Sequence, residues 1–142
     1  MAAPVGQVLH ESRAPVRHAF FPISAIVAEV GMMENGDCAQ VAMIGREGMV
    51  GMSLFLGVEP SASRASVQSA GQVLRLPARR LLEEFERGGA LMRVLLRYTQ
   101  SFTEQMVWTA ACNRCGTLEQ RLCRWLLQSL DRSLGGALTM TH

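Results

Sequence analysis

The chain has 142 residues, of which 49% are hydrophobic and 18% charged, and its formal net charge is +2. This length and composition are typical of one globular domain, or of one domain with part of a second. The small charge gives no argument for nucleic acid or an acidic membrane surface as a partner, and no apolar run approaches the roughly 20 residues that span a bilayer. The four cysteines are too few for a disulfide scaffold and no secretory signal is visible, so a reducing cytoplasm is the expected location.

Short β-type runs fill the first half of the chain. Short strands at this spacing favour a β-sandwich or a small barrel. Asn35-Gly36 lies between two apolar runs and predicts a hairpin closed by a type I′ turn. The last run is expected to form a pair of strands with Ala70-Gly71 at the turn. The β-type runs are residues 5–11, 18–33, 38–44 and 65–76.

Three glycines, Gly45, Gly48 and Gly51, recur at every third position between two β-type runs. Glycine permits positive φ and a close approach of the backbone to a ligand. Successive N–H groups in such a turn can also hold an anion. Because glycine is the default turn residue, the same spacing fits corners of a β-roll that hold no ligand. Both interpretations stay open at this point.

The hydrophobic period changes from that of strands to that of helices after Leu76. Residues 77–87 predict a short helix that Gly88-Gly89 ends. From residue 90 to about residue 111 there is neither proline nor glycine, and a stripe of side chains recurs at alternating spacings of four and three. The stripe fits either a helix packed on the strands or a dimer seam. Its residues are Leu91, Leu95, Tyr98, Phe102, Gln105 and Thr109.

A further helix is predicted from Leu118 to about Leu134. Thr117 and Gln120 have the spacing of a capping box at its start, and Gly135-Gly136 follows its end. The apolar face of this helix is formed by Leu122, Trp125, Leu126 and Leu130.

Taken in order, four segments resemble the Crp/Fnr family of bacterial transcription regulators: FFPISAIV, GREGMVG, SRASVQSAGQVLRLP and CNRCGTLEQRLCRWLLQSLDR. The resemblance implies an α+β chain, with an antiparallel double-stranded β-helix (jelly roll) followed by a long dimerisation helix and one further helix. It assigns residues 1–88 to a cyclic nucleotide-binding-like β-roll with a short helix, and residues 89–115 to the dimerisation helix. Residues 116–142 would begin a winged helix-turn-helix domain that is truncated before its recognition helix.

The resemblance also implies a ligand pocket in the roll. In nucleotide-binding relatives a glutamate holds the ribose hydroxyl and an arginine holds the phosphate, which it binds through two hydrogen bonds. On this sequence the glutamate position falls on Met52, and the arginine falls one place late, at Arg64. Neighbouring strand residues face opposite sides, so Arg64 is expected to point away from the pocket unless the loop of residues 57–62 absorbs the shift. A cyclic nucleotide is therefore disfavoured and the effector is unknown. The positions implied for a ligand are Gly51, Met52, Ser53, Ser63, Arg64, Ala65, Met106 and Val107.

Cys112 and Cys115 form a CxxC pair, which suits a metal ligand pair, a redox pair or two ordinary helix cysteines. A structural zinc site needs two more ligands, and the histidines are scattered, so no metal site is predicted. Because no set of residues has the spacing of a catalytic site, the chain is not expected to be an enzyme.

Three hypotheses follow. The first is the effector-sensing and dimerisation part of a Crp/Fnr-like DNA-binding transcription regulator, a homodimer through the long helix that reaches DNA only through a helix-turn-helix absent from this chain. In it an effector in the roll shifts the helix pair by favouring one of two states. The alternative is a stand-alone small-molecule or cyclic nucleotide-binding module without DNA binding. The third is a structural dimer with an empty pocket.

Overall fold

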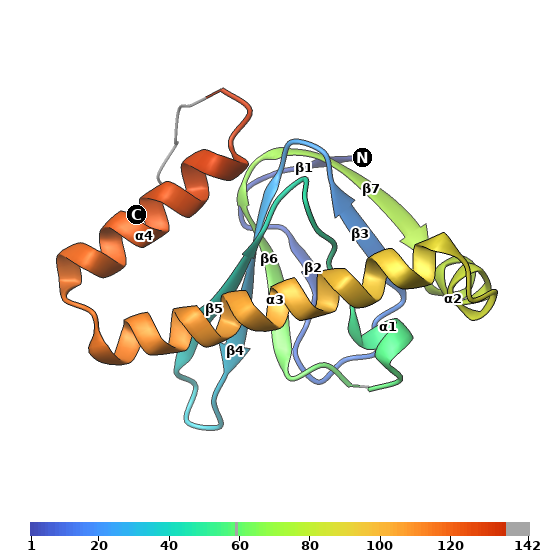
Figure 1. The fold of residues 1–142 in the computed structure, drawn as a ribbon, viewed down its shortest axis with the longest axis horizontal. Helices are drawn as coiled ribbons and strands as arrows, with labels where there is room; N and C mark the ends of the chain where they lie inside the picture. The colour runs from blue at the N-terminus through green and yellow to red at the C-terminus, as the bar shows by residue number, and fades with distance from the viewer. Residues whose placement is uncertain (59, 136–142) are drawn as a thin grey trace.

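A computed structural model of the chain describes residues 1–58 and 60–135. It consists of a β-roll with a long helix along one side and a second helix folded back beside that helix (Figure 1). The end of the segment predicted to begin a helix-turn-helix domain, residues 136–142, lies outside the described residues. The elements are β1 (Ala2–Ala3), β2 (Val8–His10), β3 (His18–Pro22), β4 (Ile26–Met32), β5 (Cys38–Ile44), α1 (Ser53–Leu56), β6 (Ser63–Ser69), β7 (Gly71–Pro77), α2 (Ala78–Glu86), α3 (Ala90–Cys115) and α4 (Leu118–Arg132).

The roll is built from two antiparallel sheets. One sheet has the strand order β1-β7-β3 and the other has the order β2-β6-β4-β5. The side chains between them form a core that excludes water, as the apolar faces of two packed sheets require. Its members include Phe20, Val27, Ile44, Val67 and Val73, each no more than 6% exposed. The predicted α+β architecture, a jelly roll followed by a long helix and one further helix, is confirmed.

The strands on either side of Ala70 do not pair with each other, so the predicted pairing within residues 65–76 is wrong. β6 belongs to one sheet and β7 to the other, because the chain crosses between the sheets at this point. The connection from β3 to β4 crosses at the same corner: the N–H groups of Ile23 and Ser24 donate to the carbonyl of Gln72 at 2.8 and 3.2 Å. A Cβ on Gly71 would meet the backbone of Ser24 and Ala25. Glycine is needed here for close backbone approach, a contact that strand patterning does not reveal.

The hairpin between β4 and β5 is confirmed, but its turn differs from the prediction. Gly36 has a φ of 88°, and its N–H donates to the carbonyl of Met33 at 3.1 Å. The N–H of Met33 donates to the carbonyl of Asp37 at 2.8 Å. This is a three-residue loop with glycine in the left-handed position, rather than a two-residue type I′ turn. The side chain of Asn35 stabilises the loop by accepting from the backbone N–H of Asp37 at 3.1 Å.

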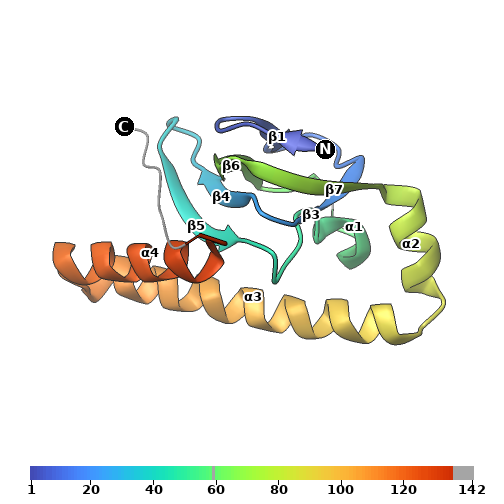
Figure 2. The ribbon, with the colours of Figure 1, turned by 90° about the horizontal axis from the view of Figure 1, so that it is seen from above.

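The long helix α3 lies along the roll for most of its length (Figure 2). Leu95 and Phe102 are 4% and 6% exposed, and they belong to two separate apolar clusters of the roll. Tyr98 lies between them and packs against both clusters. One face of α3 therefore completes the core of the roll.

Helix α4 begins at the predicted capping box: the Thr117 hydroxyl accepts from the Gln120 N–H, and the Gln120 side chain accepts from the Thr117 N–H. Its packed face agrees only in part with the predicted apolar one, of which Trp125 and Leu126 are half-buried. Ser129 is the buried residue of the helix, at 1% exposed, whereas Leu122 and Leu130 are 51% and 41% exposed. Within residues 1–58 and 60–135, no helix has both the length and the hydropathy that a bilayer span requires.

The crossing at Gly71 yields a stability prediction. Gly71→Ala would force a methyl group into the backbone of the crossing segment, and we expect it to lower the free energy of unfolding by about 2 kcal/mol. Urea denaturation of both proteins measures the difference. Gly135→Ala is the control, since a Cβ at Gly135 meets nothing within 4 Å. Equal losses in the two variants would contradict a specific backbone contact at Gly71.

Candidate ligand site between the roll and the long helix

A cavity of about 750 Å³ lies between the roll and α3. This is within the range of volumes that small-molecule sites occupy in proteins. Its walls come from the β2-β6-β4-β5 sheet, from the segment around α1 and from the C-terminal half of α3. Most of the lining side chains are apolar, among them Val41, Ile44, Met49, Met52, Leu56, Val58, Phe102 and Met106.

The eight positions implied for a ligand divide into two groups. Five of them line the cavity: Gly51, Met52, Ser53, Ser63 and Met106. The other three, Arg64, Ala65 and Val107, are not among its lining residues.

Each of these three residues has a different environment. Ala65 is 0% exposed and belongs to the core between the sheets. Val107 is 61% exposed on α3. Arg64 follows the cavity-lining Ser63 on β6 and points the other way, as strand alternation requires. Its side chain is 39% exposed, and its Nε lies 3.5 Å from Oε2 of Glu11. Of the described residues that line the cavity, none is an arginine or a lysine.

A buried polar cluster interrupts the apolar wall of the cavity. The Ser63 hydroxyl donates a short hydrogen bond to Oε1 of Glu29, and His10 Nε2 lies 3.4 Å from the same oxygen. His10 and Glu29 are each 9% exposed. The second carboxylate oxygen of Glu29, Oε2, is buried and has no hydrogen-bond partner. The cluster therefore presents an unsatisfied acceptor within an apolar site.

The cluster owes its position to the register of the strands. Glu29 pairs with Ala65 across β4 and β6 and is two residues from the core residue Val27, so it shares the inner face of its strand. A register shift follows Glu29 in the pairing with β5, and another lies between Val8 and His10 in β2. Such bulges re-aim side chains and occur often beside functional sites. Sequence analysis missed this pair, although a glutamate at an inward position of an apolar strand was a signal available to it.

The environment of His10 changes its protonation. Burial lowers its pKa, but the hydrogen bond and the charge of Glu29, together with contacts to Glu11, outweigh burial and raise the pKa above the ordinary value of 6.5. The imidazolium form is thus stabilised next to the carboxylate.

Each of the three glycines in the Gly45–Gly51 turn occupies a position that requires glycine for a different reason. A Cβ on Gly48 would lie 2.7 Å from ring carbons of Tyr98, and a Cβ on Gly45 would lie 2.8 Å from Cγ of Arg132. Gly51 has a φ of 99° and lines the cavity. Neither interpretation foresaw the role of the first two glycines, which admit α3 and α4 to the turn, whereas Gly51 has the place at the cavity that a ligand-binding turn requires.

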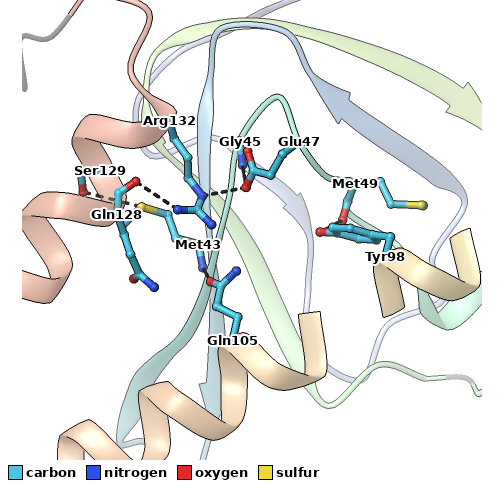
Figure 3. A network of polar contacts seen from close by, with 9 residues as sticks. All are labelled: Met43, Gly45, Glu47, Met49, Tyr98, Gln105, Gln128, Ser129 and Arg132. Carbon is cyan, nitrogen blue, oxygen red and sulfur yellow. Dashed lines mark hydrogen bonds and ion pairs between the residues drawn. The ribbon is translucent and has the colours of Figure 1, made fainter. Parts of the chain in front are cut away.

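Hydrogen bonds attach both helices to the end of β5 and to this turn (Figure 3). The N–H of Met43 donates to Oε1 of Gln105 on α3 at 2.6 Å, and the Ser129 hydroxyl of α4 donates to the sulfur of Met43 at 3.6 Å. Arg132 Nε donates to Oε1 of Glu47 at 2.7 Å. The Tyr98 hydroxyl donates to the carbonyl of Met49 at 3.2 Å, and burial, the largest influence on this phenol, raises its pKa.

The stripe assigned to a dimer seam is used within the chain. Leu95 and Phe102 are buried against the roll. The Tyr98 hydroxyl donates to a backbone carbonyl of the roll, and the Gln105 side chain accepts from a backbone N–H. Leu91 packs against the second apolar cluster, and the Thr109 hydroxyl donates to the carbonyl of Gln105. Leu95 and Phe102 therefore follow the first interpretation of the stripe, a helix packed on the strands, and are not free to meet a partner. Pairing through the other four residues, which are half-buried, stays a prediction. The opposite face of α3 carries Leu96, Gln100, Thr103 and Val107, all exposed and again spaced by four and three.

The four cysteines are free thiols. Across the part of the chain that the structure describes, no three His, Cys, Asp or Glu residues are grouped closely enough to hold a metal ion. Cys112 and Cys115 lie on the last turns of α3, where Cys115 is exposed.

Comparison with known proteins identifies the fold. No family model matches the sequence, and no curated protein matches it. Among solved structures, FixK2 from Bradyrhizobium japonicum has a TM-score of 0.78 at 14% identity, over 99% of this chain and 71% of that chain. A transcriptional regulator of the Crp/Fnr family from Eubacterium rectale has a TM-score of 0.77 at 10% identity, over 92% and 62%. The c-di-GMP responsive global regulator CLP from Xanthomonas campestris has a TM-score of 0.74 at 14% identity, over 98% and 69%. The chain has the fold of these Crp/Fnr transcription regulators and spans about two thirds of their length.

The His10–Glu29 pair predicts a pH dependence of stability. Because the pKa of His10 is raised in the folded protein, its contribution is complete below the ordinary value of 6.5 and is lost as the pH rises through the folded-state value. We expect wild type to lose more unfolding free energy than His10→Gln when the pH is raised from about 6 to about 8. Urea denaturation at the two pH values measures this. Parallel changes in the two proteins would show that His10 does not interact with Glu29 as described.

Proposed function

We propose that this chain is the effector-sensing part of a Crp/Fnr-like transcription regulator. A small molecule held between the roll and α3 would control how α3 and α4 sit on the roll. The fold of its structural neighbours supports a regulator, and one observation supports the sensing role: the wall of the cavity and the attachments of α3 and α4 use adjacent residues. Met106 lines the cavity beside Gln105, and Ile44 lines it beside Met43.

This adjacency gives a physical route for the signal. A ligand that displaces Met106 or Ile44 strains the hydrogen bond between Gln105 and Met43. Met43 also accepts from Ser129, so the same displacement acts on α4. A ligand shifts the helices only if it binds their two arrangements with different affinity. Because α3 forms part of the wall, a change in the position of α3 would change the cavity and with it the affinity for the ligand.

Two chains would pair through α3, and DNA would be bound by a further segment of a longer protein, which the share of the neighbours' length covered by this chain supports. The chain itself would perform no catalysis and would act in the bacterial cytoplasm, where its four free thiols stay reduced. No observation favours the alternative of a stand-alone binding module.

The sensing role is tested by filling the cavity genetically. Met106→Trp places a larger side chain in the cavity, and we expect it to change amide hydrogen exchange in α4 by at least about threefold, with β3 and β7 unchanged. Val94→Trp is the matched control, since it adds the same side chain to an exposed position of α3 that neither lines the cavity nor belongs to the face that carries Leu96 and Val107. Unchanged exchange of α4 in Met106→Trp would contradict coupling between the cavity and the helices.

Pairing through α3 is tested on its outer face. Leu96→Glu and Val107→Glu each put a charge where the outward stripe would meet its partner, so we expect the mass measured by sedimentation to fall from dimer to monomer. Val94→Glu, which is as exposed but lies off this stripe, is expected to remain a dimer. A monomeric wild-type chain would reject α3 as a sufficient dimer interface.

A further inference from the structure

We infer that the cavity selects a neutral, largely apolar molecule whose head group donates a hydrogen bond to Glu29, rather than an anion such as a cyclic nucleotide. The inference rests on the proposed function to the extent that the cavity is taken as the ligand site. Three observations support it: an unsatisfied acceptor, the charges of the cavity and the nature of its remaining walls.

The first observation is the unpaired oxygen of Glu29. Oε1 of Glu29 already interacts with Ser63 and His10, whereas Oε2 is buried without a partner. Oε2 has less than 1 Å² of accessible surface, so a ligand reaches it only when the carboxylate turns towards the cavity, which Glu29 lines with a side chain that is 12% exposed. A ligand that donates to Oε2 in this way removes the cost of a buried acceptor left unsatisfied. A carboxylate can only accept, which requires a donor, such as a hydroxyl or an amide N–H, on the ligand.

The second observation is the charge of the described lining. Its carboxylate, on Glu29, is balanced by the adjacent imidazole of His10, and the arginine nearest in sequence, Arg64, points out of the cavity towards Glu11. A phosphate bound here would lose its hydration without gaining an arginine, and it would face a carboxylate at low dielectric. A cationic ligand would compete with His10 for the same carboxylate. Both arguments favour a neutral ligand.

The third observation is the apolar remainder of the wall. Met52, Phe102 and Met106 lie around the cavity, and methionine side chains adapt their shape to a ligand. The cavity of about 750 Å³ is large enough for a ligand with an extended apolar body in addition to its head group. Binding energy would come mainly from this body, while orientation and selectivity would come from Glu29.

Three naphthalene derivatives of similar size separate the ligand classes. 2-Naphthol is neutral and donates a hydrogen bond, 2-methoxynaphthalene is neutral and cannot donate, and 2-naphthyl phosphate is an anion. Titration calorimetry of the full chain at about pH 7 is expected to give 2-naphthol an affinity about tenfold higher than that of the ether, the gain typical of a hydrogen bond to a charged group. The phosphate is expected to bind most weakly.

Two pairs of variants locate the effect. Glu29→Gln keeps the size of the side chain but removes its charge, and it should lower the affinity for 2-naphthol about tenfold, to near that of the ether. Glu104→Gln, on the exposed face of α3, should change nothing. Met106→Trp should abolish binding and Val94→Trp, at an exposed position of α3 away from the cavity, should not. The comparison of three ligands on wild type decides the question even if Glu29→Gln fails to fold.

The possible failures are distinguishable. Equal affinities of 2-naphthol and its ether, or stronger binding of the phosphate, would overturn the inferred ligand class and leave the proposed function standing. Binding that Met106→Trp does not affect would overturn the assignment to this cavity. Binding of none of the three compounds would reject the cavity as a ligand site, and with it both the proposed function and the inference.

Discussion

The structure depends on the close approach of two helices to one glycine turn. Without side chains at Gly45 and Gly48, the turn admits Arg132 of α4 and the ring of Tyr98 of α3. Tyr98 then packs against both apolar clusters and bonds to the carbonyl of Met49, which sets how close α3 lies to the roll. The cavity is the space left between them. A methyl group at Gly48 would push α3 outward and so change the cavity, whereas one at Gly45 would push α4, which contributes none of the described lining residues.

The polar cluster in the cavity is a local departure from what stability alone would select. An apolar side chain in place of Glu29 would fill the space without leaving a buried oxygen unsatisfied. Where a chain keeps such a group, the compensating gain is expected at a functional site. Ser63 and His10 hold the carboxylate in one orientation, so the free oxygen has a fixed position.

Periodicity and turn residues predicted most of the elements, and the resemblance to a known family predicted their jelly-roll arrangement, but neither predicted the polar cluster of the site. The strands, the Asn35-Gly36 hairpin and the capping box at Thr117 follow from local patterns, and the structure has them. The heptad-like stripe of α3 was correctly seen as an apolar face, but periodicity cannot tell a partner helix from the chain's own roll, because both bury the same side chains. The crossing of β6 into β7 at Gly71 depends on a contact distant in sequence. The pairing of His10 with Glu29 joins residues from different strands, and only the register of the sheet brings them together.

Because α3 is one continuous helix, a tilt near Tyr98 would displace its far end, where it joins α4. If Tyr98, held between the two clusters, is the fulcrum, the arm runs from there to Cys115 and has two further attachments to the roll, at Phe102 and Gln105. At 1.5 Å per residue this arm is about 26 Å long, so a tilt of about 5° at the fulcrum moves the junction with α4 by about 2 Å. Met106 lies partway along the arm, on the cavity side. In the proposed sensing role, a sub-ångström change in how the cavity is filled would be magnified at the far end of the helix, where α4 begins.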